Sequence, residues 1–208
     1  MTFVKICGIT NLDDALLSVE YGADALGFNF YRKSRRYIAP GAAERILGEL
    51  PSGVTAVGVF VDEDPDAILD ISGQVGLNAV QLHGYESVEY VETLHKKVGL
   101  KIIKAFRVAK DFSSTEVELY KHHAILMDAY SPREFGGTGE SFDWEIARQL
   151  KAILRELYLA GGLSAENVGD AIAYVKPFAV DACSSLEASP GVKDPKKLRR
   201  FIEAAKRA

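Results

Sequence analysis

Short apolar runs alternate along the chain with segments whose apolar residues recur every three or four positions. Most of the short runs are apolar at nearly every position, which is typical of parallel strands that are covered on both faces. The runs predict eight strands, at Phe3–Cys7, Ala25–Phe28, Ala56–Val61, Ala79–Leu82, Lys101–Phe106, Ala124–Asp128, Leu157–Ala160 and Phe178–Asp181.

Helical periodicity separates these strands. Helices are expected at Asp66–Val75, Ser87–Lys97, Trp144–Leu154 and Ala165–Val175, with a weak one near Ser113–Lys121. The first helix has Thr10 as its expected N-cap, and its apolar face consists of Leu12, Ala15, Leu16 and Val19. The last helix is expected to begin at Asp194, with Pro195 in its first turn, and its apolar face consists of Leu198, Phe201, Ile202 and Ala205.

Eight complete strand–helix pairs in 208 residues favour an α/β fold, a (β/α)8 TIM barrel near the lower size limit of that fold. An open doubly wound sheet is the structural alternative. No linker, composition break or low-complexity segment divides the chain. Residues 1–208 are therefore expected to form a single domain.

Composition excludes several classes of protein. Hydrophobic residues make up 48% of the chain, charged residues 26%, and the formal net charge is −4. These values are typical of a soluble globular protein and give no sign of nucleic-acid or anionic-membrane binding. No apolar run has the length of a membrane span, and residues 1–10 lack a signal-peptide pattern. The two cysteines lack zinc-type spacing, so a reduced, cytoplasmic protein is expected.

In a barrel of this kind the active site lies at the carboxyl ends of the strands. The predicted strands end at or near Cys7, His83, Asp128 and Asp181, so a thiol, an imidazole and two carboxylates would ring one mouth. Small residues follow the last three strands, at Gly136–Gly139, Gly161–Gly162 and Cys183–Ser185. Backbone N–H groups of such loops can approach an anion closely, and the loops after strands seven and eight are the common phosphate site of the fold. A small phosphorylated substrate is therefore expected.

Each candidate also has a purely structural explanation. Taken alone, Cys7 is more readily explained as a packed thiol than as a base. Asp128 would equally cap a turn or pair with an arginine, and His83 would serve structure or binding rather than catalysis. Asp181 would orient loop backbone. The basic cluster at residues 32–36 would be a solvated loop, from which one arginine suffices to bind a carboxylate.

Seven segments nevertheless match one family in order along the chain. The matching segments are KICGIT at 5–10, GFNFYRKSRRYI at 27–38, VGVFV at 57–61, QLHG at 81–84, MDAY with GGTG at 127–139, LAGGL at 159–163 and VDACSSLEASPGVKD at 180–194. With these motifs the sequence resembles the phosphoribosylanthranilate isomerases of tryptophan biosynthesis.

The resemblance implies an Amadori rearrangement of N-(5-phosphoribosyl)anthranilate, an aldose–ketose isomerisation. The family's base falls on Cys7 and its acid on Asp128, which overturns the packing explanation for the thiol. Cys7 must then be partly thiolate although free cysteine titrates near pH ~8.5. Asp128 must hold a proton although a free aspartate titrates near pH ~3.9. Lys5 shares a strand face with Cys7, so a positive neighbour for the thiol is expected to be within reach.

The resemblance also assigns substrate binding. Arg36 falls on the arginine that binds the anthranilate carboxylate, and phosphate binding falls to the backbone of Gly137, Gly161 and Gly162 and to the region of Ser184 and Ser185. His83 and Asp181 are expected to contribute to binding. No metal, nucleotide or organic cofactor is implied, because proton transfer alone completes the reaction. The oligomeric state stays open between a monomer and a homodimer.

One departure from the family pattern lies after strand eight. The family usually reads VDVSSGVE, whereas this chain has Cys183 in place of a serine and Ser185 in place of a glycine. If the glycine needs a positive φ, Ser185 is expected to be strained by about 1 kcal/mol or more. Strands one and eight adjoin in a closed barrel, so Cys183 is also expected to come near Cys7, and a disulfide between the two would abolish the base.

Alternatives from other classes remain at this stage. The isomerase of histidine biosynthesis usually relies on paired aspartates and pentose-phosphate epimerases on metal-binding histidines, and neither accounts for KICGIT. A non-catalytic barrel that retained phosphate binding is the alternative from outside enzymes, and the altered loop after strand eight is the only hint toward it.

Overall fold

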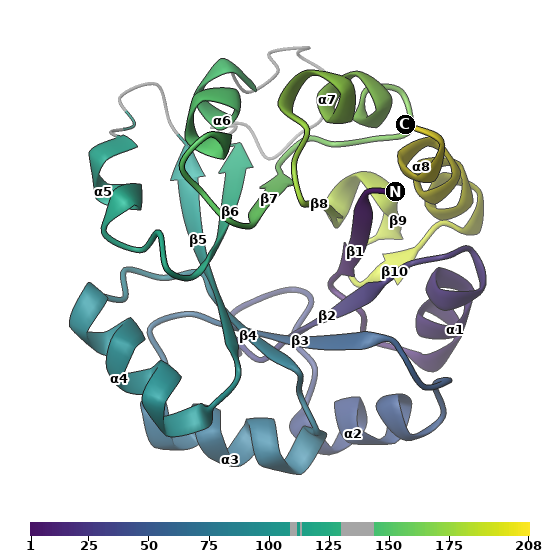
Figure 1. Ribbon diagram of the computed structural model, residues 1–208. Coiled ribbons are helices and arrows are strands. Elements are labelled where there is room, and N and C mark those ends of the chain that lie inside the picture. Colours follow the sequence, from purple (N-terminus) through teal and green to yellow (C-terminus); the bar gives the residue numbers. More distant parts are fainter. Residues whose placement is uncertain (109–111, 113, 130–143) are drawn as a thin grey trace.

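The computed structural model describes residues 1–108, 112, 114–129 and 144–208. Eight parallel strands close into a barrel in sequential order, because β1 pairs with β8 as well as with β2 (Figure 1). The strands are β1 (Phe3–Cys7), β2 (Ala25–Asn29), β3 (Thr55–Phe60), β4 (Ala79–Leu82), β5 (Lys101–Val108), β6 (Ala124–Ala129), β7 (Leu157–Ala160) and β8 (Ala179–Ala182). The closed barrel confirms the predicted fold class and excludes the open sheet.

The helices form a ring around the barrel, which Figure 1 shows plainly for α1 to α4 and for α6 to α8. They are α1 (Leu12–Glu20), α2 (Pro40–Gly48), α3 (Pro65–Val75), α4 (Val88–Val98), α5 (Ser114–Glu118), α6 (Trp144–Lys151), α7 (Val168–Val175) and α8 (Pro195–Arg207). The weak pattern near Ser113–Lys121 corresponds to the short α5. Asp64 and Asp194 cap α3 and α8, and each is followed by a proline at the first helical position, as expected for Asp194.

The strands are apolar on both faces because they face two cores. One core lies between the strands and the helices and contains Leu26 and Phe28 of β2. The other fills the barrel with mostly smaller residues, such as Ala25, Ala79 and Ala179. Alternation along each strand therefore decides which side chains point into the barrel. The inward positions nearest the carboxyl ends are the ones that reach the site.

Two local expectations were wrong. Asn11, not Thr10, caps α1, because its side chain accepts a hydrogen bond from the Asp14 N–H at 2.9 Å. Thr10 instead donates its hydroxyl to the Gly191 carbonyl. Leu16 is 40% exposed, so the buried stripe of α1 is narrower than the periodicity indicated.

The chain after β8 adds elements that the strand–helix pattern did not predict. A short 3₁₀ helix (Ser184–Leu186) is followed by β9 (Glu187–Ser189) and β10 (Val192–Lys193), which pair antiparallel. This hairpin lies beside β1 and α1 in Figure 1. It brings Glu187 and Lys193 to the carboxyl end of β1.

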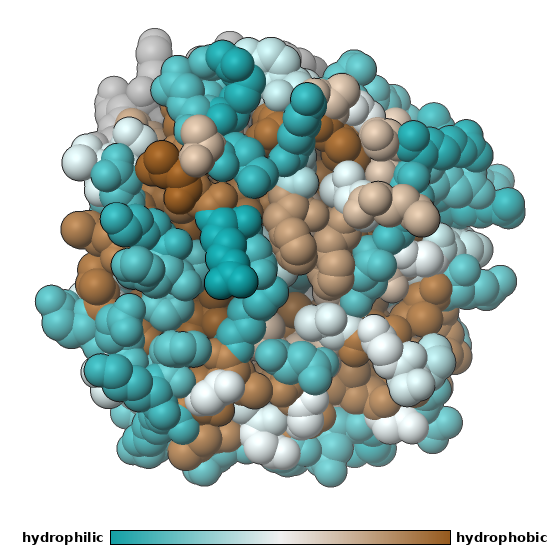
Figure 2. Space-filling view, viewed as in Figure 1, coloured by the Kyte–Doolittle hydropathy of each residue, from teal (hydrophilic) through white to brown (hydrophobic). Residues whose placement is uncertain are grey.

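On the face seen in Figure 2, hydrophilic and apolar residues are interspersed, both around the periphery and near the centre. Among the described residues, no helix combines the length and the apolar character that a bilayer crossing demands.

Candidate active site

Cys7 ends β1 and lines a cavity of about 250 Å³ at the carboxyl end of the barrel. Its partner in β2 is Gly27. A Cβ on Gly27 would lie 2.8 Å from Cys7 Sγ and 3.2 Å from Lys5 Nζ, so the bare backbone of β2 leaves the room that both groups occupy. The expected positive neighbour is therefore present on the same strand face.

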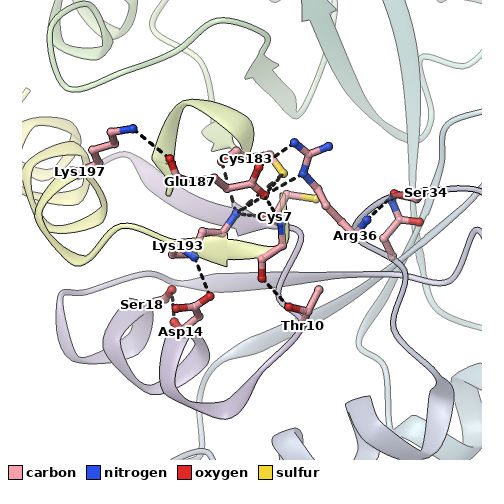
Figure 3. A network of polar contacts seen from close by, with 12 residues as sticks. Cys7, Thr10, Asp14, Ser18, Ser34, Arg36, Cys183, Glu187, Lys193 and Lys197 are labelled. Carbon is pink, nitrogen blue, oxygen red and sulfur yellow. Dashed lines mark hydrogen bonds and ion pairs between the residues drawn. The ribbon is translucent and has the colours of Figure 1, made fainter. Parts of the chain in front are cut away.

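Cys183 lies beside Cys7, as expected for adjoining strands, and both cysteines are free thiols (Figure 3). The neighbouring Cys183 side chain, together with the positive charges of Lys5 and Lys193, holds the pKa of the Cys7 thiol well below its usual range against the opposing effect of burial. The Cys7 side chain and its charge, together with burial, raise the pKa of Cys183. Cys7 is thus the thiolate of the pair and Cys183 the thiol.

Lys5 and Asp181 form a buried ion pair at the floor of the site. Lys5 Nζ lies 2.9 Å from Asp181 Oδ2, with the two side chains 0% and 8% exposed. Burial alone would lower the pKa of Lys5, but the charges of Asp181 and Cys7 raise it. Burial raises the pKa of Asp181 to about 7, although Lys5 opposes the shift. Lys5 therefore keeps its charge, and it lies between two acidic groups.

Asp128 is the last residue but one of β6, at an inward position, and lines the same cavity as Cys7. His83 follows β4, and its Nε2 lies 3.4 Å from Asp128 Oδ2. The other ring nitrogen of His83 lies 3.3 Å from the side-chain nitrogen of Gln81. Both predicted residues are in the site, and the Asp128 carboxyl is 33% exposed, which leaves it accessible to a substrate.

Arg36 lines the cavity, but the edge of its guanidinium that carries Nε and Nη2 is already paired with a carboxylate of the protein. Its Nε and Nη2 donate to the two carboxylate oxygens of Glu187 at 2.8 and 2.7 Å. A guanidinium carries five N–H groups. Three of them are not used by Glu187. Of the basic cluster, Arg36 is the residue that turns inward, whereas Arg32 lies over the ring of Tyr37.

Lys193 connects the β9–β10 hairpin to the site through polar contacts (Figure 3). Its buried Nζ donates to the Cys7 carbonyl at 2.6 Å and lies 3.4 Å from Glu187 Oε1. Reasoning from the sequence singled out neither Lys193 nor Glu187, although both stand in the matched segment at 180–194. The two residues lie on either side of Pro190–Gly191. This proline–glycine pair is the sequence signal for a turn that brings their side chains together.

The small-residue loops after β7 and β8 border the cavity. Gly161 and Gly162 have φ of 83° and 65°, values that favour glycine, and both line the cavity with Ser184 and Ser185. The strain expected at Ser185 was wrong: Ser185 lies in the 3₁₀ helix, outside the left-handed region, and its hydroxyl donates to the Leu163 carbonyl. Gly137 lies outside the described residues.

The predicted residues thus meet in one place. A barrel whose mouth joins a thiolate, a carboxyl, an arginine and small-residue loops has the arrangement of an enzyme that acts on a small anionic molecule.

Comparison with known proteins narrows this class. Residues 4–204 match the family model of N-(5′-phosphoribosyl)anthranilate (PRA) isomerase. An N-(5′-phosphoribosyl)anthranilate isomerase from Geobacter sp. strain M21 is 52% identical, covering 100% of this chain and 99% of that protein. The chain therefore belongs to the N-(5′-phosphoribosyl)anthranilate isomerase family.

Solved structures agree over the whole length. The crystal structure of phosphoribosyl anthranilate isomerase from Thermotoga maritima matches with a TM-score of 0.93 and 49% identity, covering 100% of both chains. A complex of the isomerase with reduced 1-(o-carboxyphenylamino)-1-deoxyribulose 5-phosphate matches with a TM-score of 0.90 and 47% identity, again over 100% of both chains. Monomers of the dimeric Thermotoga maritima enzyme match with a TM-score of 0.87 and 45% identity over 100% of both chains.

Proposed function

We propose that this protein converts N-(5′-phosphoribosyl)anthranilate to 1-(2-carboxyphenylamino)-1-deoxyribulose 5-phosphate in tryptophan biosynthesis. The reaction moves two protons and needs an acid and a base on either side of one substrate. The observation that carries the proposal is that Cys7 and Asp128, from β1 and β6, line one cavity. Family membership over the whole chain supports it.

Asp128 is the acid in this proposal. It protonates the furanose ring oxygen, so that the C1′–O bond breaks and a Schiff base to the anthranilate nitrogen forms. The thiolate of Cys7 then removes the proton from C2′, giving an enol that tautomerises to the ketone. The lowered pKa of Cys7 supplies the base at neutral pH.

Binding residues hold the two anionic ends of the substrate. We assign the anthranilate carboxylate to the N–H groups of Arg36 that Glu187 does not use. The phosphate is assigned to the loops of Gly161 and Gly162 and of Ser184 and Ser185, which border the cavity.

Two further residues complete the assignment. His83 and Asp181 are assigned to positioning the sugar, since His83 contacts Asp128 and Asp181 lies at the floor of the cavity. The assignment of Gly137 to the phosphate remains a prediction.

The setting of the enzyme is proposed at the same level. A homodimer is supported by the dimeric relative from Thermotoga maritima. A cytoplasmic location fits a biosynthetic enzyme with reduced thiols. The alternative of a non-catalytic phosphate-binding barrel is disfavoured, because it gives no use to the thiolate and the carboxyl that share the cavity.

The test is turnover of freshly generated phosphoribosylanthranilate, followed by loss of its fluorescence under reducing conditions. Cys7→Ser and Asp128→Asn should each lower kcat by about 10²–10⁴-fold, the usual contribution of a positioned acid or base. Asp70→Asn, an exposed aspartate on α3, is the matched control and should keep full activity. A folded but inactive wild type would favour the binding protein, and an active Cys7→Ser variant would remove Cys7 from the mechanism.

A further inference from the structure

The proposed mechanism leaves Cys183 without a role, although it lies beside the base (Figure 3). In the β1–β8 pairing Ile6 is opposite Ala182, so the next residue of each strand, Cys7 and Cys183, leaves the barrel side by side. Figure 3 shows the two sulfur atoms near each other, with Arg36 and Lys193 on either side. A Cβ on Gly8 would lie 2.8 Å from Cys183 Sγ, so Cys183 is packed closely against the backbone that follows β1.

Cys183 lies beside two acceptors, a carboxylate oxygen of Glu187 and the sulfur of Cys7 (Figure 3). Its Sγ lies 3.8 Å from Glu187 Oε1. That oxygen already accepts from Arg36 Nε at 2.8 Å and from the Gly191 N–H at 3.2 Å, and it lies 3.4 Å from Lys193 Nζ. Lys193 Nζ also lies 3.9 Å from Cys183 Sγ. Because Glu187 Oε1 already has these donors, the Cys183 proton adds most when it is donated to the neighbouring sulfur of Cys7.

The surrounding charges favour this direction of the hydrogen bond. Charged or titratable groups face the two thiols from β1, the loop after β2, the end of β4, β6, β8 and the β9–β10 hairpin. They are Lys5, Arg36, His83, Asp128, Asp181, Glu187 and Lys193. Lys5 and Lys193 stabilise a negative Cys7, whereas the Cys7 charge keeps Cys183 protonated. A thiol donor to a thiolate is a charge-assisted hydrogen bond, which is stronger than a neutral one.

We propose that Cys183 is a positioning residue of the isomerisation, which donates its S–H to the sulfur of Cys7 and holds that sulfur ready as the base. The inference rests on the proposed role of Cys7. It gives the residue after β8 a function in proton abstraction in addition to its place beside the phosphate loops. A serine at this position would offer the same donor through its hydroxyl.

The experiment compares Cys183→Ala, which removes the donor, with Cys183→Ser, which keeps one. The chain contains two cysteines, so each variant leaves Cys7 as the sole thiol. Its ionisation can then be followed directly by the ultraviolet absorbance of the thiolate and by the rate of alkylation with iodoacetamide. The pH profile of kcat/KM reports the same ionisation in the free enzyme.

In Cys183→Ala the thiolate titration and the acid limb of kcat/KM should both move up by about one pH unit. At pH values below the thiolate pKa, kcat/KM should then be about tenfold lower than in the wild type, because a shift of one pH unit lowers the thiolate fraction about tenfold. At pH values above the shifted pKa, kcat/KM should recover. Cys183→Ser should restore the wild-type limb to within about threefold, because it retains the donor.

Other outcomes would overturn the inference. An unchanged titration in Cys183→Ala would show that Cys183 does not act on Cys7, and an equal loss of activity at every pH would show a structural role. If the wild type proves inactive, the thiolate titration still decides whether Cys183 donates to Cys7, so the two proposals fail separately.

Discussion

Replacing Lys5 by methionine tests how the site residues depend on one another. Lys5 is fully buried, and its ammonium lies 2.9 Å from Asp181. Methionine fills a similar volume without the charge, so Asp181 would be left buried without its cation. Breaking a buried ion pair from one side costs about 3–5 kcal/mol. Lys5→Met should therefore lower the free energy of unfolding by an amount in this range.

The loss should depend on pH with a defined sign. Burial raises the pKa of Asp181 to about 7 in the folded protein, whereas an unfolded aspartate titrates near pH ~3.9. The folded state therefore binds the extra proton between these values, and this group makes the protein less stable as the pH rises through that window. Without Lys5 the folded pKa of Asp181 rises further. The deficit of Lys5→Met relative to the wild type should then be smallest near pH ~5 and largest near pH ~8.

Urea unfolding at several pH values measures this dependence. Lys101→Met is the matched control, because Lys101 forms a 2.7 Å pair with Glu156 but is 42% exposed. It should cost about 1 kcal/mol or less. Adding Asp181→Asn to Lys5→Met removes the titrating group and should recover stability, more so at high pH. A Lys5→Met variant as stable as Lys101→Met, or a double variant no better than Lys5→Met, would refute the reasoning.

Three shorter predictions concern the cavity wall. Arg36→Lys should raise KM about tenfold or more with a smaller effect on kcat, because one ammonium cannot serve both Glu187 and a substrate carboxylate; steady-state kinetics checks this, and an unchanged KM would contradict it. Diamide, a thiol oxidant, should form a disulfide between Cys7 and Cys183 and abolish activity until dithiothreitol is added. The Cys183→Ser variant cannot form this disulfide, and mass spectrometry under non-reducing conditions should detect it in the wild type alone. Ser185→Gly should lower stability by about 1 kcal/mol without improving inhibition by inorganic phosphate, since Ser185 is unstrained and its hydroxyl is hydrogen-bonded; tighter phosphate binding would show that the loop is strained after all.

Much of the fold could be predicted because strand and helix periods differ clearly along this chain. The barrel requires apolar residues on both faces of each strand, and runs such as Ala79–Leu82 and Leu157–Ala160 match the observed strands to the residue. Helix starts were less predictable. Thr10 and Asn11 are both good N-caps, and the choice between them depends on Gly191, which lies far away in sequence but accepts the Thr10 hydroxyl.

The site could be predicted only as far as strand ends define it. The rule that barrel strands carry chemistry at their carboxyl ends places Cys7, Asp128 and Asp181 at the mouth. The roles of Cys7 as base and Asp128 as acid came only from the resemblance to the family. The pair between Arg36 and Glu187 does not follow from this rule, because it joins the loop after β2 to the start of β9, 151 residues further along the chain. Its geometry depends on a hairpin after β8 that neither period indicates, since β9 and β10 have only three and two residues.

The buried lysine explains why a thiol ends β1. Lys5 and Cys7 are two residues apart on one strand face, so an ammonium in the barrel interior lies next to the sulfur. A buried cation is costly unless negative charge surrounds it. Asp181 alone does not supply a full negative charge near neutral pH, because its pKa is raised to about 7. A thiolate at Cys7 provides the remaining negative charge. The charge that stabilises Lys5 in the folded barrel is therefore the same charge that the proposed reaction uses to remove a proton, and stability and basicity at this position depend on each other.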